Sequence, residues 1–258
     1  MTFDADLTAC AALVEKADPD RFSATMAAPV AARRVLFPIY AMNVEVSRAP
    51  WVTQEAMIAE MRLQWWRDAL AEIAAAGPVR RHEVVTPLAR ALTPALAAQL
   101  DAYVAVRRWD IYRDPFEDAA HLDSYIDQSA ATLMWVSTQA LGQADEATVR
   151  NLGYAAGVAG FLRAVPELEM RGRVPLFDGT PEGVRALATS AMDKLKTARA
   201  NRRLISAQAR PALLTAWQAS SVLRQVIDDP RRVADGRLGQ SRFHTHAGLV
   251  WQSLTGRW

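Results

Sequence analysis

Three glycines at helical spacing constrain this chain more than any other feature of its sequence. Gly153, Gly157 and Gly160 follow one another at i, i+4 and i+7, so a helix through them carries all three on one face. Each glycine costs a helix roughly 1 kcal/mol relative to alanine. That cost is explained if a neighbouring helix or a flat apolar ligand must approach the backbone closely. Two interpretations stay open: tight helix–helix packing, and one wall of a long apolar cavity.

Charged residues follow these glycines within two helical turns, from Arg163 to Arg173. A cavity built on this helix would therefore have an apolar floor and a charged mouth. Arg163 is the most suggestive of these charges, because a buried guanidinium requires a partner. Asp127, Glu45 or an anionic ligand could supply that partner.

Helix signals dominate the rest of the sequence, and strand signals are nearly absent. Prolines, glycines and capping residues such as Asp145 and Thr180 separate the apolar segments. The sequence predicts an all-α chain with one domain over residues 1–258, a core from about 19 to 227, and a loosely ordered tail over 228–258. The expected helices span approximately residues 3–17, 29–48, 53–75, 87–92, 94–112, 123–141, 145–171, 180–205 and 208–227.

The charge of the chain is small overall but unevenly distributed. A net charge of +2 gives no general case for nucleic-acid binding, and we expect no nucleic-acid partner. Between Asp193 and Arg242, however, eleven lysines and arginines stand against four aspartates. A solvated helical face explains this bias, and an anionic membrane or partner surface is the alternative.

Compartment signals are few. The single cysteine, Cys10, cannot form an internal disulfide, which is typical of a reducing compartment. The first residues lack the charged-then-apolar pattern of a signal peptide. No run approaches the roughly 18 consecutive apolar residues of a membrane-spanning helix. We therefore expect a soluble, cytoplasmic protein.

A metal ion bound by carboxylate side chains is the remaining kind of catalytic site to consider in this all-α chain. Two aspartates at i and i+4, facing a second such pair, can hold Mg²⁺ ions that bridge a substrate diphosphate. Asp123 and Asp127 have this spacing. They also fall in the first turns of an expected helix, where negative charge is favoured without any metal.

Three stretches of the chain resemble the squalene/phytoene synthase family, the head-to-head prenyl transferases with the terpenoid-synthase fold. The stretches are Tyr40–Asn43, Ser124–Asp127 with Ala131–Met134, and Leu152–Arg163 with Arg171–Leu176. The likeness covers roughly residues 19 to 227 in order and spacing. It implies a helical bundle around a central cavity.

The chain departs from the family pattern at the metal-binding positions. The two Asp-x-x-x-Asp motifs of active members correspond here to Ser47 with Trp51 and to Ala164 with Leu168. The resemblance therefore implies no catalytic residue, no metal ligand and no cofactor. Glu45 lies about 200° round the helix from Ser47 and would give a displaced site at best.

A branch of the family carries Leu-Gln-Trp-Trp-Arg-Asp-Ala-Leu, which is present here as Leu63–Leu70. This branch is similar to a mitochondrial respiratory complex I assembly factor that keeps the fold without clear catalysis. The resemblance implies a non-catalytic helper in complex I biogenesis, with a complex I subunit or assembly protein as partner. It also implies peripheral contact with the inner membrane.

Two other functions stay open. The first is an active head-to-head prenyl transferase that requires Mg²⁺ in a site rebuilt from Glu45, Glu167 or Asp127. The second is a carrier of an apolar isoprenoid lipid, with arginines receiving an anionic head group. The residues expected to line the cavity or bind a ligand are Tyr40, Arg48, Trp51, Gly157, Gly160, Arg163 and Arg171.

Overall fold

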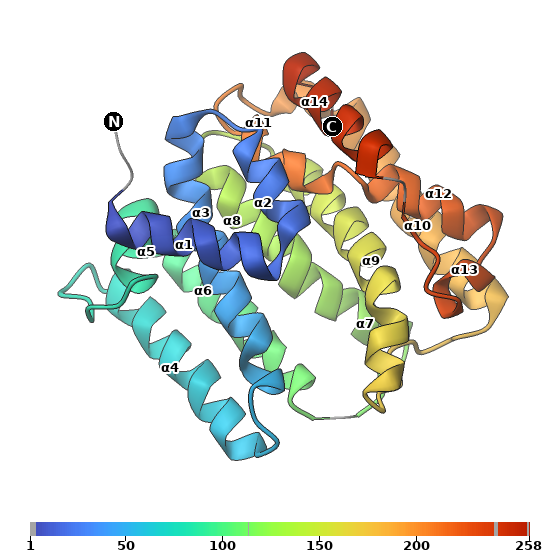
Figure 1. Cartoon of the computed structure of the whole chain (residues 1–258), viewed down its shortest axis with the longest axis horizontal. Helices are drawn as coiled ribbons and strands as arrows, with labels where there is room; N and C mark the ends of the chain where they lie inside the picture. Colours follow the sequence, from blue (N-terminus) through green and yellow to red (C-terminus); the bar gives the residue numbers. More distant parts are fainter. Residues whose placement is uncertain (1–3, 113, 240–241, 257) are drawn as a thin grey trace. The chain divides into compact units, whose positions relative to one another are not determined.

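The computed structural model describes residues 4–112, 114–239, 242–256 and 258. Regular structure in these ranges is helical, and an isolated antiparallel bridge between Ala144 and Ile205 is the sole strand-like pairing among them (Figure 1). The predicted all-α class is confirmed. The chain forms two compact units. Unit 1 comprises residues 1–112, 136–143 and 206–215, and unit 2 comprises residues 113–135, 144–205 and 216–258.

Unit 1 is built on α3 (Val30–Arg48), a helix with a buried middle. Its side chains from Leu36 to Met42 are all buried, and the helix continues through Pro38 without a break. It packs against α1, α2, α5 and α11, while α4 packs on α6. The other elements of this unit are α1 (Ala5–Ala17), α2 (Pro19–Met26), η1 (Ala49–Trp51), α4 (Ala56–Ala74), α5 (Val85–Ala91), α6 (Pro94–Val106), η2 (Arg107–Asp110), the end of α8 (Thr132–Gln139), α11 (Arg210–Leu213) and the start of η5 (Leu214–Ala216).

Unit 2 is built on the glycine-bearing helix, α9 (Glu146–Met170). It packs against α10, α12, α13 and the π-helical turn η3 (Asp127–Ala131). This turn continues α7 and leads into α8. The other elements of this unit are α7 (Ala119–Ile126), α10 (Pro181–Ala200), η4 (Arg202–Leu204), α12 (Ala219–Asp228), α13 (Arg231–Ala234) and α14 (Arg242–Thr255).

Side-chain caps begin the two longest helices of unit 2, as the sequence predicts. The Asp145 carboxylate accepts the Thr148 N–H at 2.8 Å, and the Thr180 hydroxyl accepts the Gly183 N–H at 3.1 Å. Such bonds satisfy backbone donors that the first helical turn leaves unpaired.

Two predicted helix starts are wrong. Helix α4 begins at Ala56 rather than near Thr53, whose hydroxyl accepts the Glu55 N–H in the preceding loop. The helix expected from residue 123 begins at Ala119, because Asp118 caps it through the His121 N–H. A capping aspartate outside the apolar pattern therefore sets this boundary.

The segment 228–258, expected to be a loosely ordered tail, contains helices in its described part. The described part of this segment contains α13 and α14, and it buries Leu249 and Trp258. These apolar side chains allow the segment to pack against the rest of unit 2. Its arginine- and glycine-rich composition did not indicate this packing. Within the described ranges, no helix combines the length and apolar character that a bilayer crossing requires.

Candidate functional site

Helix α4 carries apolar side chains on two faces, and the core covers one of them. Its buried face consists of Ala59, Leu63, Trp66, Ala69, Leu70 and Ile73. On the other face, Met57, Ile58 and Met61 are 76%, 41% and 64% exposed. Exposed apolar side chains gathered in one place mark interaction sites more often than scattered ones do.

A groove opens beside this second face. It has a volume of about 430 Å³ and lies among α3, α4 and the loop before α5. Ile58, Met61 and the two indoles make it mainly apolar, and two side chains of opposite charge stand at its edge. The groove is lined by Glu45, Ile58, Met61, Arg62, Trp65, Trp66 and His82.

Aromatic contacts fix the inner end of the groove. The Trp65 and Trp66 rings meet edge to face with centroids 5.1 Å apart, and the His82 ring lies 5.1 Å from the first and 5.8 Å from the second. The Arg80 guanidinium lies 4.8 Å from the Trp65 ring centroid and donates to both carboxylate oxygens of Glu72. These contacts give the groove a rigid wall.

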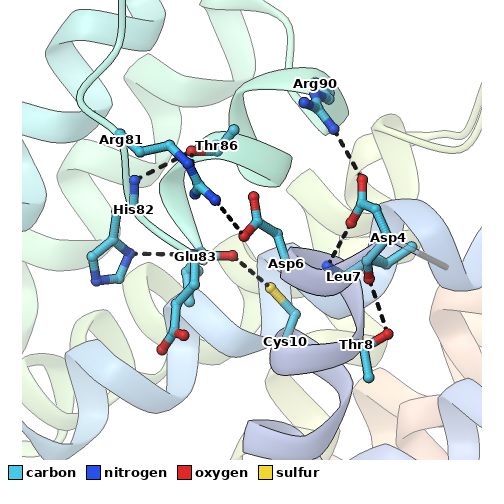
Figure 2. A network of polar contacts seen from close by, with 11 residues as sticks. Asp4, Asp6, Leu7, Thr8, Cys10, Arg81, His82, Glu83, Thr86 and Arg90 are labelled. Atoms are coloured by element: carbon cyan, nitrogen blue, oxygen red, sulfur yellow. Dashed lines mark hydrogen bonds and ion pairs between the residues drawn. The ribbon is translucent and has the colours of Figure 1, made fainter.

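Polar contacts with α1 hold the loop that carries His82 (Figure 2). The His82 Nδ1 accepts the N–H of Val84 at 3.1 Å. The Arg81 guanidinium donates to Asp6 at 2.8 Å, and the Cys10 thiol donates to the carbonyl oxygen of Glu83 at 3.5 Å. The inner wall of the groove is thus tied to the first helix of the chain.

The side of α3 that faces α6 is polar around Ser47. The Tyr103 hydroxyl donates to Asn43 Oδ1 at 2.6 Å, and Asn43 lies one turn before Ser47. Burial raises the pKa of the Tyr103 phenol, while Arg107 and a hydrogen bond with Ser47 act in the opposite direction. Arg107 in turn forms a 2.7 Å ion pair with buried Asp110. Ser47 therefore belongs to an internal polar cluster of unit 1.

Tyr40 lies three residues before Asn43 on α3 and is buried. The Arg21 guanidinium sits 5.0 Å from its ring centroid, and the same side chain donates to Asp18 at 2.8 Å. Burial raises the pKa of the Tyr40 hydroxyl, against the opposing charge of Arg21. The Tyr40 side chain is therefore packed in the interior of unit 1.

The remaining predicted site residues of unit 1 lie at its surface. Arg48 is exposed, with a guanidinium nitrogen 3.8 Å from Glu45 Oε1. Trp51 is 38% exposed and belongs to the short helix η1. Glu45 faces the α4 groove, on the opposite side of α3 from Asn43 and Ser47.

The glycine face of α9 confirms the helix-packing interpretation at two of its three positions. A Cβ at Gly153 would lie 2.7 Å from Ala131 Cα, and one at Gly157 would lie 2.5 Å from Ala130 Cβ. Both distances are shorter than any real Cβ contact, so glycine is needed for η3 to approach α9. At Gly160 no described atom lies within 4 Å of the added Cβ, and the residue is exposed.

Arg163 is exposed, so its guanidinium does not need the partner that burial would require. Asp127, named as its candidate partner, instead holds Arg150 at 2.5 Å. Arg171 forms a 2.6 Å ion pair with Glu167 on the surface of unit 2. Arg163 and Arg171 thus lie at the surface, whereas Arg173 is buried. Ala164 and Leu168 are both half-buried.

Asp123 and Asp127 both have structural partners. The Tyr154 hydroxyl donates to Asp123, and the Lys194 ammonium lies 4.1 Å from the centroid of the Tyr154 ring. Arg150 donates to Asp127 and also to the Thr132 hydroxyl at 3.3 Å. The pair therefore fastens α7 and η3 to α9. In the part of the chain that the structure describes, no three side chains of His, Cys, Asp and Glu gather as a metal site would require.

Sequence reasoning missed the groove residues Ile58, Met61, Arg62 and His82. Trp65 and Trp66 entered it only as part of the Leu63–Leu70 stretch. A signal was present, because Met57, Met61 and Trp65 recur every four residues beside the separate series of buried positions. An apolar pattern wider than one stripe predicts that a helix has two apolar faces.

Known proteins give matches over most of the chain. The family model for squalene/phytoene synthase matches residues 14–176. The complex I assembly factor 6 homolog of Drosophila melanogaster is 31% identical over 166 residues, which cover 61% of this chain and 50% of that protein. Complex I assembly factor 6 of Mus musculus is 23% identical over 250 residues, which cover 84% of this chain and 72% of that protein. The chain thus spans about half the length of the fly relative.

Solved structures show the same fold. A dehydrosqualene synthase matches with a TM-score of 0.78 at 16% identity, over 97% of this chain and 96% of that one. A squalene synthase from Alicyclobacillus acidocaldarius matches with a TM-score of 0.68 at 15% identity, over 88% and 94%. The expected terpenoid-synthase fold is confirmed. With its fold and the family match in agreement, the chain belongs to the squalene/phytoene synthase family.

Proposed function

We propose that this protein is a non-catalytic binding and assembly protein that acts in respiratory complex I biogenesis. The observation that carries the proposal is the set of side chains at the four expected metal positions: Ser47, Trp51, Ala164 and Leu168. The similarity to relatives named as complex I assembly factor 6 supports the proposed role in complex I biogenesis. A fold does not by itself carry its activity, which depends on the site residues.

The side chains at these positions do not fit a magnesium–diphosphate site. Mg²⁺ prefers carboxylate and other oxygen ligands in octahedral geometry, and among the four only Ser47 offers an oxygen. The acids proposed for a rebuilt site have other roles. Glu167 is paired with Arg171 and Asp127 with Arg150, while Glu45 lines the α4 groove.

The α4 groove supplies a binding surface in place of that site. We assign to it an amphipathic helix of a complex I subunit or assembly partner. Small ligands are normally enclosed on most sides, whereas this groove continues along α4 into exposed Met57 and Met61. Flexible methionine side chains adapt to the apolar face of a helix laid in a groove. Glu45 and Arg62 offer opposite charges to the polar rim of such a helix.

Deletion of the gene in its source organism, followed by native-gel measurement of assembled complex I, tests the proposal. We expect the deletion strain to lose assembled complex I and the wild-type gene to restore it. Complex I that assembles normally without the gene would refute the assembly role.

Rescue by variants tests the groove separately. Ile58→Asp with Met61→Asp places charge on the groove wall, and we expect this variant not to restore complex I. The control Met170→Asp changes a side chain that is 81% exposed at the end of α9, and we expect full rescue. Thermal unfolding of each purified variant shows whether it is folded. A folded groove variant that rescues would remove the groove from the proposal.

A further inference from the structure

The outer face of α14 exposes large apolar side chains. Val250, Trp251 and Leu254 are 55%, 62% and 80% exposed, and their spacing of i, i+1 and i+4 places them on one face of the helix. The inner side of the helix is fixed by buried Leu249 and by Gln252, whose amide donates to the Trp217 carbonyl at 3.1 Å. The helix is therefore docked, with an apolar face left outside.

The end of α14 lies against the end of α10. The Arg199 Nε donates to the Trp258 carbonyl at 2.9 Å, and another of its nitrogens donates to the Ser220 hydroxyl of α12 at 3.3 Å. Figure 1 shows α14 next to α12 and α10 within unit 2. The turn η4 begins three residues after Arg199, so it extends this same end of the unit.

This end of unit 2 carries more basic than acidic side chains. Residues 193–205 contain five lysines and arginines and one acid, Asp193, which pairs with Lys196 at 2.8 Å. Residues 216–227 contain Arg224 and no acid, and in residues 235–258 the one acid, Asp235, pairs with Arg237. Arg202 and Arg203 are exposed on η4 and are followed by Leu204, which is 51% exposed. Burial and then the nearby positive charge of Arg224 lower the pKa of Arg199. The arginines are concentrated enough to repel one another.

Exposed tryptophan and leucine beside exposed arginines are the two signals that hold a protein at a bilayer surface. Indole rings and short apolar side chains enter the headgroup region, and arginines contact lipid phosphates. We propose that the α14 surface, defined as Val250, Trp251 and Leu254 with Arg202 and Arg203, binds the surface of an anionic phospholipid bilayer.

Charge complementarity identifies the bilayer as the partner. The surface holds a few apolar side chains and a basic fringe, whereas a standard protein interface takes about 20–30 residues on each side. The inference does not depend on a role in complex I biogenesis, because it uses only the residues of unit 2.

Co-sedimentation of the full chain with lipid vesicles tests this surface. We expect binding to vesicles of mixed phosphatidylcholine and phosphatidylglycerol, little binding to phosphatidylcholine alone, and release at high salt. Arg202→Gln with Arg203→Gln should weaken binding about 30-fold, since each basic residue near an anionic membrane contributes about 1 kcal/mol. Trp251→Ser with Leu254→Ser should weaken it by at least about tenfold, through lost apolar contact with the lipid.

Two matched variants serve as controls. Met170→Ser with Val174→Ser removes two exposed apolar side chains, one from the end of α9 and one from the loop after it. Arg81→Gln with Arg90→Gln removes two charges from unit 1. Both should bind vesicles nearly as well as the wild type does. Equal binding to neutral vesicles, or unchanged binding by the Trp251→Ser/Leu254→Ser variant, would overturn the proposal. It would also fail if the protein dimerises without lipid and this variant makes it monomeric, because the face would then be a protein interface.

Discussion

Cys10 is fully buried in α1, in contact with the loop that carries His82 (Figure 2). Burial, and then the negative charges of Glu83, Asp6 and Asp4, raise the pKa of its thiol from 9.0 to about 12. The thiolate is the reactive form of cysteine. The folded protein therefore holds this thiol in an unreactive state.

We predict that a thiol reagent leaves Cys10 unmodified in the folded protein near neutral pH and modifies it at once in denaturant. Because the folded pKa lies above the unfolded value, the protonated thiol contributes stability fully below about pH 9. That contribution is lost as the pH rises toward the folded pKa. Labelling time courses, and unfolding of the wild type and Cys10→Ser across this pH range, measure both effects. Rapid labelling of the folded protein would contradict the prediction.

Tyr154 joins α9 to α7 through its hydrogen bond to Asp123. Burial, and then Asp123, raise the pKa of the Tyr154 phenol, so its hydroxyl stays a donor. We predict that Tyr154→Phe lowers the free energy of unfolding by about 1 kcal/mol. Denaturant unfolding measures this loss.

Tyr112 offers the matched control, because its hydroxyl also donates to a carboxylate, that of Glu60, at an exposed site. Tyr112→Phe should change stability by less than about 0.5 kcal/mol. Equal losses of unfolding free energy in the two variants would show that the buried hydrogen bond stabilises the protein no more than the exposed one does.

Two glycine substitutions one turn apart on α9 test whether its glycines are needed for neighbouring elements to approach closely. Gly157→Ala puts a methyl 2.5 Å from Ala130 and 2.9 Å from Ile126, so η3 must move. We predict a loss of about 1–3 kcal/mol from this overpacking, larger than the gain in helix propensity. Gly160→Ala meets no described atom within 4 Å and should stabilise the protein by up to about 1 kcal/mol.

Chemical denaturation of both variants decides this point. If Gly157→Ala and Gly160→Ala change stability alike, the glycines are not there for helix packing.

The helices themselves could be predicted because their signals are local. Asp145 and Thr180 cap the helices that the sequence assigns to them, and the glycine spacing indicates a close contact. The Arg150–Asp127 ion pair could not be predicted, because its members lie 23 residues apart on different elements. The α4 groove was missed because an apolar pattern does not tell which of two faces the core will cover.

At the scale of the whole molecule, each unit carries one surface suited to binding. The α4 groove of unit 1 exposes methionine and isoleucine beside rigid indoles, and the α14 surface of unit 2 exposes tryptophan among arginines. This arrangement is what we expect of a chain that kept the fold of an enzyme and uses its exterior.

Since Ile58 and Met61 of the groove are exposed, their substitution should separate binding from folding. We predict that Met61→Asp changes the free energy of unfolding by less than about 0.5 kcal/mol. A large loss of stability would mean that Met61 is needed for the packing of α4. Thermal unfolding, with Met170→Asp as the control, gives the answer.

Whether this protein is non-catalytic can be measured by its turnover of prenyl substrates. The purified protein would be incubated with farnesyl and geranylgeranyl diphosphate and Mg²⁺, beside an active squalene synthase, and diphosphate release measured. Because Ser47, Trp51, Ala164 and Leu168 offer no carboxylate to a metal, we predict no release above that of a protein-free control. Release that depends on Mg²⁺ and yields a joined prenyl product would contradict it.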